Sequence, residues 1–77
     1  MTALKVFISG GDKYVAGMAR ALAFWSAPNH RTGQASVKAS KLESNFILLR
    51  FYTEEHLSEF KRALEKYLPN SAVIIDD

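Results

Sequence analysis

The sequence contains no cysteine, and none of its apolar runs approaches the roughly 18 residues that a membrane-spanning helix needs. Without cysteine the chain has neither a disulfide framework nor a thiolate metal site, although small secreted domains usually rely on such cross-links. Its first residues also lack the charged start and the long apolar run of a signal peptide. We therefore expect a cytoplasmic protein that does not bind a membrane.

Side chains suited to catalysis or metal binding are equally few. The two histidines, His30 and His56, have no serine, carboxylate or second ligand at a recognisable spacing. His56 falls in the first turn of a predicted helix, where we interpret it as solvent-exposed. Glu54 and Glu55 are adjacent on the same helix and point in different directions, so they do not form an acid–base pair. We expect no enzyme activity, no catalytic residue, no metal ion and no cofactor.

Apolar side chains are present in excess. They make up 48% of the 77 residues, and aromatic residues make up 12%, in a chain long enough for one domain over residues 1–77 but not for two. This excess indicates that some apolar surface lies in an interface. Charge is also unevenly placed, because residues 13–53 contain six basic side chains and one acidic one, whereas residues 54–77 have a net charge of −3. The basic middle segment is compatible with an anionic partner.

Apolar alternation, helical spacing and turn residues predict six elements in the order βαββαβ. Strands are predicted over 3–9, 35–42, 45–52 and 72–75, a first helix from the N-cap Asp12 to about Ser26, and a second helix from the N-cap Thr53 to Pro69. A polar loop is predicted at 29–34. Two βα crossovers with a hairpin between them predict an α+β sandwich of the ferredoxin-like type, in which two helices cover one face of a four-stranded antiparallel sheet.

Such a sheet leaves one face uncovered, and the period of two along a strand determines which side chains lie on it. If Ile47, Leu49 and Phe51 point toward the helices, the alternate residues of their strand point away. The candidate binding residues of the uncovered face are Phe7, Lys38, Phe46, Leu48, Arg50 and Tyr52. An apolar and aromatic surface with basic residues at its margin is typical of partner binding. Two alternatives are open: Phe46, Leu48 and Tyr52 form a dimer interface, or the opposite register makes them the core.

Two of the predicted strands resemble the signatures of the RNA recognition motif. Val6-Phe7-Ile8-Ser9-Gly10-Gly11 is similar to that family's first signature, and Ser44-Asn45-Phe46-Ile47-Leu48-Leu49-Arg50-Phe51 is similar to its second. By this resemblance Phe7 and Phe46 stack bases, while Leu49 and Phe51 belong to the core. Leu48 stands where the family has a second stacking aromatic residue. The resemblance implies RNA or single-stranded nucleic acid as the partner.

The first predicted helix is apolar on more than one side. The stripe that we expect to face the sheet contains Val15, Met18, Leu22 and Trp25. A second stripe contains Tyr14, Gly17, Ala21 and Phe24. The small residues of this second stripe leave room for a partner between its two aromatic rings, so Tyr14 and Phe24 are candidate partner-binding residues. The alternative is a broad core face with one exposed aromatic residue.

Two classes of function follow from these features. The first is a small protein-binding inhibitor, adaptor or subunit, of the type that phages and mobile elements use, whose partner is another protein or a second copy in a homodimer. The second is binding of RNA or single-stranded DNA through the uncovered sheet face. Binding that weakens steeply with salt would indicate the second class, because phosphate contacts release counterions.

Overall fold

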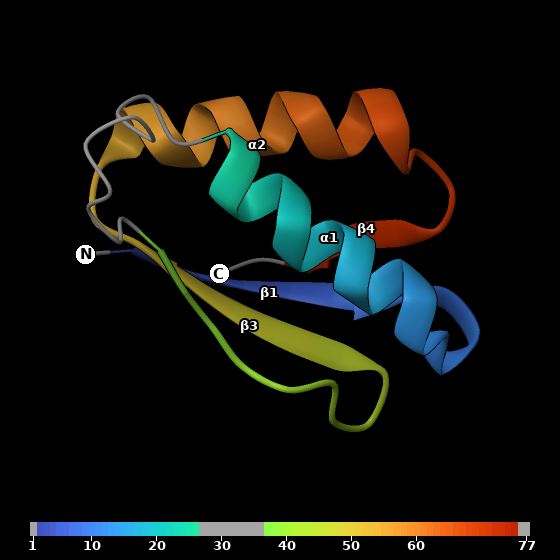
Figure 1. Ribbon diagram of the computed structural model, residues 1–77. Helices are drawn as coiled ribbons and strands as arrows, with labels where there is room; N and C mark the ends of the chain where they lie inside the picture. The colour runs from blue at the N-terminus through green and yellow to red at the C-terminus, as the bar shows by residue number, and fades with distance from the viewer. Residues whose placement is uncertain (1, 27–36, 76–77) are drawn as a thin grey trace.

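Four strands and two helices follow one another in the predicted βαββαβ order (Figure 1). The computed structural model describes residues 2–26 and 37–75. Its strands are β1 (Thr2–Ile8), β2 (Val37–Ala39), β3 (Phe46–Phe51) and β4 (Ala72–Ile75), its helices are α1 (Lys13–Trp25) and α2 (Glu54–Tyr67), and a 3-10 turn, η1 (Ser9–Gly11), joins β1 to α1. The predicted loop 29–34, with His30, lies outside the described residues.

The strands form one antiparallel sheet in the order β2-β3-β1-β4. Helix α1 crosses from β1 to the edge strand β2, and α2 crosses from β3 to the opposite edge strand β4. Both helices lie over the same face of the sheet (Figure 1). This is the α+β fold of ferredoxin-like type that the sequence predicts, and among the described residues no helix covers the second face.

The hairpin between β2 and β3 closes with a two-residue turn at Ser44 and Asn45. Both residues have positive φ, 50° and 68°, as the type I′ turn that suits twisted strands requires. On either side of the turn, Glu43 and Phe46 exchange backbone hydrogen bonds of 2.9 and 2.8 Å. The predicted hairpin is confirmed, although its first strand, β2, is shorter than expected.

Polar caps set where both helices begin. The Asp12 carboxylate accepts hydrogen bonds from the backbone N–H groups of Tyr14 and Val15, at 2.8 and 3.3 Å. The Thr53 hydroxyl accepts one from the N–H of His56 at 3.1 Å. Both N-caps agree with the sequence prediction, because short polar side chains satisfy the free N–H groups of a first helical turn.

The core lies between the helices and the inner face of the sheet. Alternation along β1 and β3 supplies most of it, through Leu4, Val6, Ile8, Ile47, Leu49 and Phe51. Helix α2 adds Leu57, Phe60 and Leu64. Because Ile47, Leu49 and Phe51 are completely buried, the opposite register of β3 is excluded.

Helix α1 faces the sheet with alanines, which corrects the prediction based on its larger residues. Its buried residues are Ala16, Ala19 and Ala23. Of the predicted stripe, Val15 and Leu22 are half-buried, whereas Met18 and Trp25 are exposed. Small side chains let the helix lie close to the sheet, so its bulky residues occupy the flanks and the outer side. The spacing of the apolar residues did not identify the face of α1 that contacts the sheet, because apolar residues occur on nearly every side of this helix.

His56 is fully buried, which corrects its interpretation as a solvent-exposed residue. Its Nε2 hydrogen-bonds with the carbonyl oxygen of Ala23 near the end of α1. Its ring packs edge-on against Phe51 with a centroid distance of 4.8 Å. Among the described residues, Nδ1 has no hydrogen-bond partner. His56 shares the inward face of α2 with Phe60, four positions later, and so connects both helices to β3.

Candidate binding surfaces

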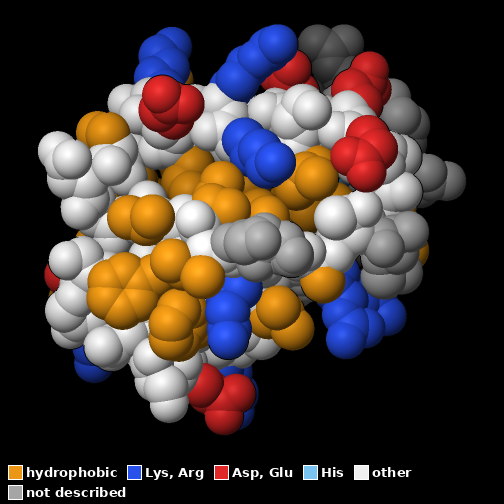
Figure 2. All heavy atoms as spheres, turned by 180° about the vertical axis from the view of Figure 1, so that it is seen from behind, with side chains coloured by type: hydrophobic (Ala, Val, Ile, Leu, Met, Phe, Trp, Pro, Cys, Tyr) orange, Lys and Arg blue, Asp and Glu red, His pale blue; other side chains and the backbone are white. Residues whose placement is uncertain are grey.

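The uncovered face of the sheet carries aromatic, aliphatic and basic side chains together. Figure 2 views the molecule from behind Figure 1, and in its lower half hydrophobic side chains gather with Lys and Arg side chains among and beside them. Register and exposure assign eight residues larger than alanine to this surface: Lys5, Phe7, Lys38, Phe46, Leu48, Arg50, Val73 and Ile75. With Tyr52, which is exposed one position after β3 and continues its alternation, they form the surface that we call the sheet platform. All six residues predicted for the uncovered face are among them.

Two phenylalanines meet on the sheet platform. Phe7 and Phe46 are directly opposite in the pairing of β1 with β3, and their rings pack edge to face with a centroid distance of 5.4 Å. The Nζ of Lys5 lies 4.7 Å from the centroid of the Phe46 ring. Both rings are only half-buried, so each keeps surface available to a ligand. The fold therefore brings together the two residues to which the sequence resemblance assigns base stacking.

Positive charge predominates on the sheet platform. Lys5, Lys38 and Arg50 are exposed, and none of them forms an ion pair with another described residue. Among residues 2–26 and 37–75, one carboxylate borders the platform, that of Glu43, which pairs with Phe46 across the hairpin turn. Within this described part of the chain, three cations against one anion give the surface a positive potential that attracts anionic partners.

Three members of the sheet platform, Lys5, Val73 and Ile75, are not predicted from the sequence. Lys5 is two residues before Phe7 in the same strand, so the period of two was sufficient to place both on one face. Val73 and Ile75 belong to an uninterrupted apolar run, Ala72–Ile75. No polar residue in this run marks which side chains point outward.

The outer side of α1 carries a second exposed apolar surface. Tyr14, Met18, Ala21 and Trp25 are spaced at i, i+4, i+7 and i+11, so they form one stripe along the helix, which we call the α1 seam. Tyr14 is 76% exposed, Met18 49% and Trp25 77%. None of the four residues is charged. A row of large apolar side chains is therefore presented to solvent.

The two partner-binding residues predicted for this helix, Tyr14 and Phe24, are both exposed. Tyr14 belongs to the α1 seam, whereas Phe24 lies about 80° from it around the helix, since successive residues are rotated by about 100°. Phe24 thus lies beside the α1 seam rather than on it. Met18 and Trp25, which the spacing assigned to the core, complete the surface to which Tyr14 belongs.

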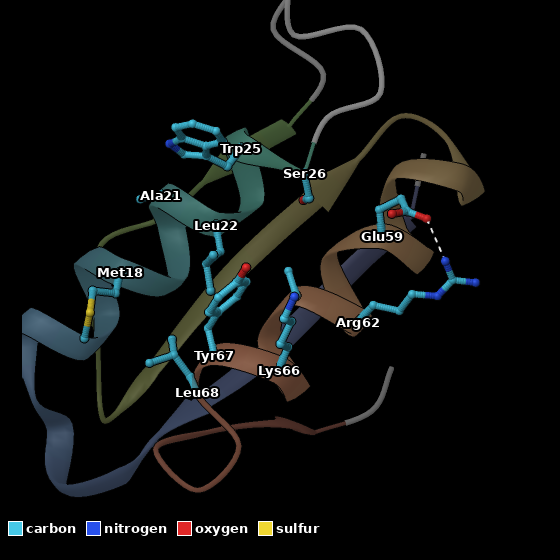
Figure 3. A pocket seen from close by; sticks show the side chains of 11 residues that line it. Met18, Ala21, Leu22, Trp25, Ser26, Glu59, Arg62, Lys66, Tyr67 and Leu68 are labelled. Carbon is cyan, nitrogen blue, oxygen red and sulfur yellow. Dashed lines mark hydrogen bonds and ion pairs between the residues drawn. The ribbon is translucent and has the colours of Figure 1, made fainter.

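A groove of about 830 Å³ separates the outer sides of α1 and α2 (Figure 3). Leu22 of α1 and Tyr67 of α2 point toward one another across it. Met18 and Trp25 line its α1 side, which makes the groove continuous with the α1 seam. Tyr67 is 60% exposed, so its ring is available to whatever occupies the groove.

Charged side chains of α2 border this groove. Arg62 and Glu59 form an ion pair with an N–O distance of 3.1 Å, an exposed arrangement that contributes at most about 1 kcal/mol. The Nζ of Lys66 lies 5.2 Å from the centroid of the Tyr67 ring. An apolar centre with a charged margin is the usual anatomy of a protein–protein interface.

Within residues 2–26 and 37–75, no three His, Asp or Glu side chains are placed to hold a metal ion. None of the described helices is long and apolar enough to cross a membrane. His56 is enclosed by α1, α2 and β3 and reaches neither surface.

No protein-family model, no curated protein and no solved structure matches the chain. Function is therefore inferred from two surfaces on opposite sides of the molecule, the sheet platform and the α1 seam with its adjoining groove.

Proposed function

We propose that this chain is a small protein-binding module, of the inhibitor, adaptor or subunit type, which binds its partner through the α1 seam and the adjoining groove. The observation that carries the proposal is the two-sided apolar character of α1. Ala16, Ala19 and Ala23 face the sheet, and the α1 seam faces solvent. A helix that is apolar on opposite sides is typical of one that is buried on both.

The exposed area supports this proposal. With aromatic side chains offering about 150–250 Å² each, the exposed parts of Tyr14, Met18, Trp25 and Tyr67 amount to roughly 500 Å². A standard protein interface buries about 800 Å² on each partner. These four side chains alone thus supply more than half of that area. Trp and Tyr are also the residues in which binding energy is most often concentrated.

Photo-crosslinking tests the proposal. A benzophenone side chain placed at Met18 is expected to form covalent adducts with protein in a nuclease-treated lysate, because Met18 lies where the α1 seam meets the groove. The same side chain at Phe24 is the matched control, since Phe24 is on the same helix and equally exposed but is off the seam. Equal adduct yields at the two positions would contradict the proposal.

A second function, binding of RNA or single-stranded DNA, is favoured by one specific observation on the sheet platform. Phe7 and Phe46 are adjacent and partly open, with the ammonium of Lys5 against Phe46. Lys38 and Arg50 are opposite one another on β2 and β3, within the same face. Aromatic rings that stack bases beside cations that contact phosphates are the common basis of single-strand binding.

If this second function holds, Phe46→Ala is expected to weaken binding of a fluorescent oligouridylate by about 5- to 150-fold, since stacking contributes about 1–3 kcal/mol per base. Phe24→Ala is the matched control, because it removes an exposed phenylalanine from the helical side. Fluorescence anisotropy at low and moderate salt measures both. Unchanged affinity in Phe46→Ala, or an equal loss in Phe24→Ala, would rule out stacking on the platform.

A further inference from the structure

We infer that the protein bound at the α1 seam is a second copy of this chain, and that the two α1 helices pack antiparallel about a two-fold axis. The inference rests on the proposed function, in that the helical side binds protein, and it identifies that protein as a second copy, so that at this surface the chain acts as a subunit of a homodimer. The α1 seam is self-complementary in the spacing of its residues, in their sizes and in its lack of charge.

Spacing makes the α1 seam symmetric. The midpoint of positions 14 and 25 lies between residues 19 and 20, and so does the midpoint of positions 18 and 21. In an antiparallel pair centred there, Tyr14 of each copy is opposite Trp25 of the other, and Met18 is opposite Ala21. Every seam residue thus has a seam residue as its neighbour, which is the condition for an isologous two-fold interface.

Side-chain size favours the antiparallel pair over the parallel one. Antiparallel packing places Met18, a long and flexible side chain that adapts to irregular gaps, against the space left by Ala21. It also places aromatic residues, Tyr14 and Trp25, at both ends of the contact. In a parallel pair Ala21 of one copy is opposite Ala21 of the other. These two small side chains leave a gap between the helices, so packing contacts are lost there.

Charge does not oppose this pairing. The charged residues of α1 are Lys13 and Arg20, and both lie about 80° or more around the helix from every residue of the α1 seam. No charge is therefore buried between the two α1 helices. The two helix dipoles also run in opposite directions, which is the favourable arrangement for neighbouring helices.

The area available predicts a weak dimer. Two copies contribute roughly 1,000 Å² of seam and groove side chains in total, which is at the low end for specific interfaces, where association is transient. We expect a dissociation constant in the micromolar range or weaker. Because the helices and the sheet platform are on opposite sides of the sheet, both platforms stay open in this dimer.

Sedimentation velocity from about 1 to 300 µM tests the inference. The average mass of the wild type is expected to rise from that of the 8.6 kDa monomer toward twice that value. Ala21→Glu, which places a charge at the centre of the α1 seam, is expected to stay monomeric at all concentrations. Phe24→Glu, the same change off the seam, is expected to behave as the wild type. A wild type that stays monomeric, or an Ala21→Glu variant that still dimerises, overturns the inference.

Disulfide trapping tests the direction of pairing and does not depend on Ala21→Glu. The natural sequence has no cysteine, so engineered thiols are the only ones present. A mixture of Tyr14→Cys and Trp25→Cys chains is expected to form a mixed disulfide, whereas neither chain alone does, because equivalent positions then lie about 16 Å apart along the helix. Disulfides between two Tyr14→Cys chains would overturn the antiparallel arrangement.

The crosslinking at Met18 separates failure of this inference from failure of the proposed function. Adducts of twice the chain mass support self-pairing. Adducts with a different protein, formed by a chain that sediments as a monomer, overturn self-pairing and leave the proposed function standing. If Met18 forms no protein adducts, both the self-pairing and the proposed function are wrong.

Discussion

Leu49→Ala is expected to lower the free energy of unfolding by about 2–5 kcal/mol, the range for removing a buried leucine side chain and leaving a cavity. Leu49 is completely buried on the inner side of β3. A chain of this length has a total stability of about 4–12 kcal/mol, at about 0.05–0.15 kcal/mol per residue. The substitution therefore removes a large part of the stability, and urea denaturation measures it.

Leu48→Ala is the matched control for this prediction. Leu48 is the preceding residue of the same strand, but it points to the opposite side and is 38% exposed. Its replacement is expected to cost less than about 1 kcal/mol, as for surface substitutions. Similar losses for the two leucines would contradict the assignment of inner and outer faces on β3, and with it the composition of the sheet platform.

His56→Ala is expected to destabilise the fold by about 2–4 kcal/mol. The substitution removes a completely buried ring that packs on Phe51, and it leaves the carbonyl oxygen of Ala23 without the hydrogen bond from Nε2. The same ring connects α2 to the end of α1, so its loss weakens the contact between the helices. Chemical denaturation monitored by circular dichroism measures the change.

Two further variants separate the contributions of His56. His56→Phe keeps an aromatic ring and removes the hydrogen bond from Nε2, while the Ser26 hydroxyl still donates to the Ala23 carbonyl at 3.3 Å, so it is expected to cost about 0.5–1.5 kcal/mol, the net value of one hydrogen bond. Glu55→Ala changes the exposed neighbour in the same helical turn and is expected to cost less than about 1 kcal/mol. If His56→Ala were no worse than Glu55→Ala, the buried position of His56 would be wrong.

Much of the fold follows from local patterns in the sequence. Alternation along β3 places Ile47, Leu49 and Phe51 inside and Phe46 outside, and both N-caps are residues whose short side chains suit that position. Neighbouring residues determine these features, so one strand or one helical turn contains the necessary information. The uncovered face of the sheet was predictable for the same reason.

The inner face of α1 was not predictable in this way. Its buried residues are three alanines, whereas larger apolar residues occur on its other sides, so the helix sequence alone does not show which side packs on the sheet. Met18 and Trp25 lie on the outer side, where they form the α1 seam with Tyr14. His56 was misassigned for a related reason, since its hydrogen-bond partner, Ala23, comes from the other helix, 33 positions earlier in the chain.

The central claim is that the helical side of this molecule binds protein, and crosslinking from Met18 compared with Phe24 in a nuclease-treated lysate tests it most directly. We predict protease-sensitive adducts from Met18 that are much more abundant than those from Phe24, with the mass of two copies of the chain as the main species. Adducts from Phe24 alone, or equal and low yields from both positions, would contradict the claim and leave the sheet platform as the remaining binding surface.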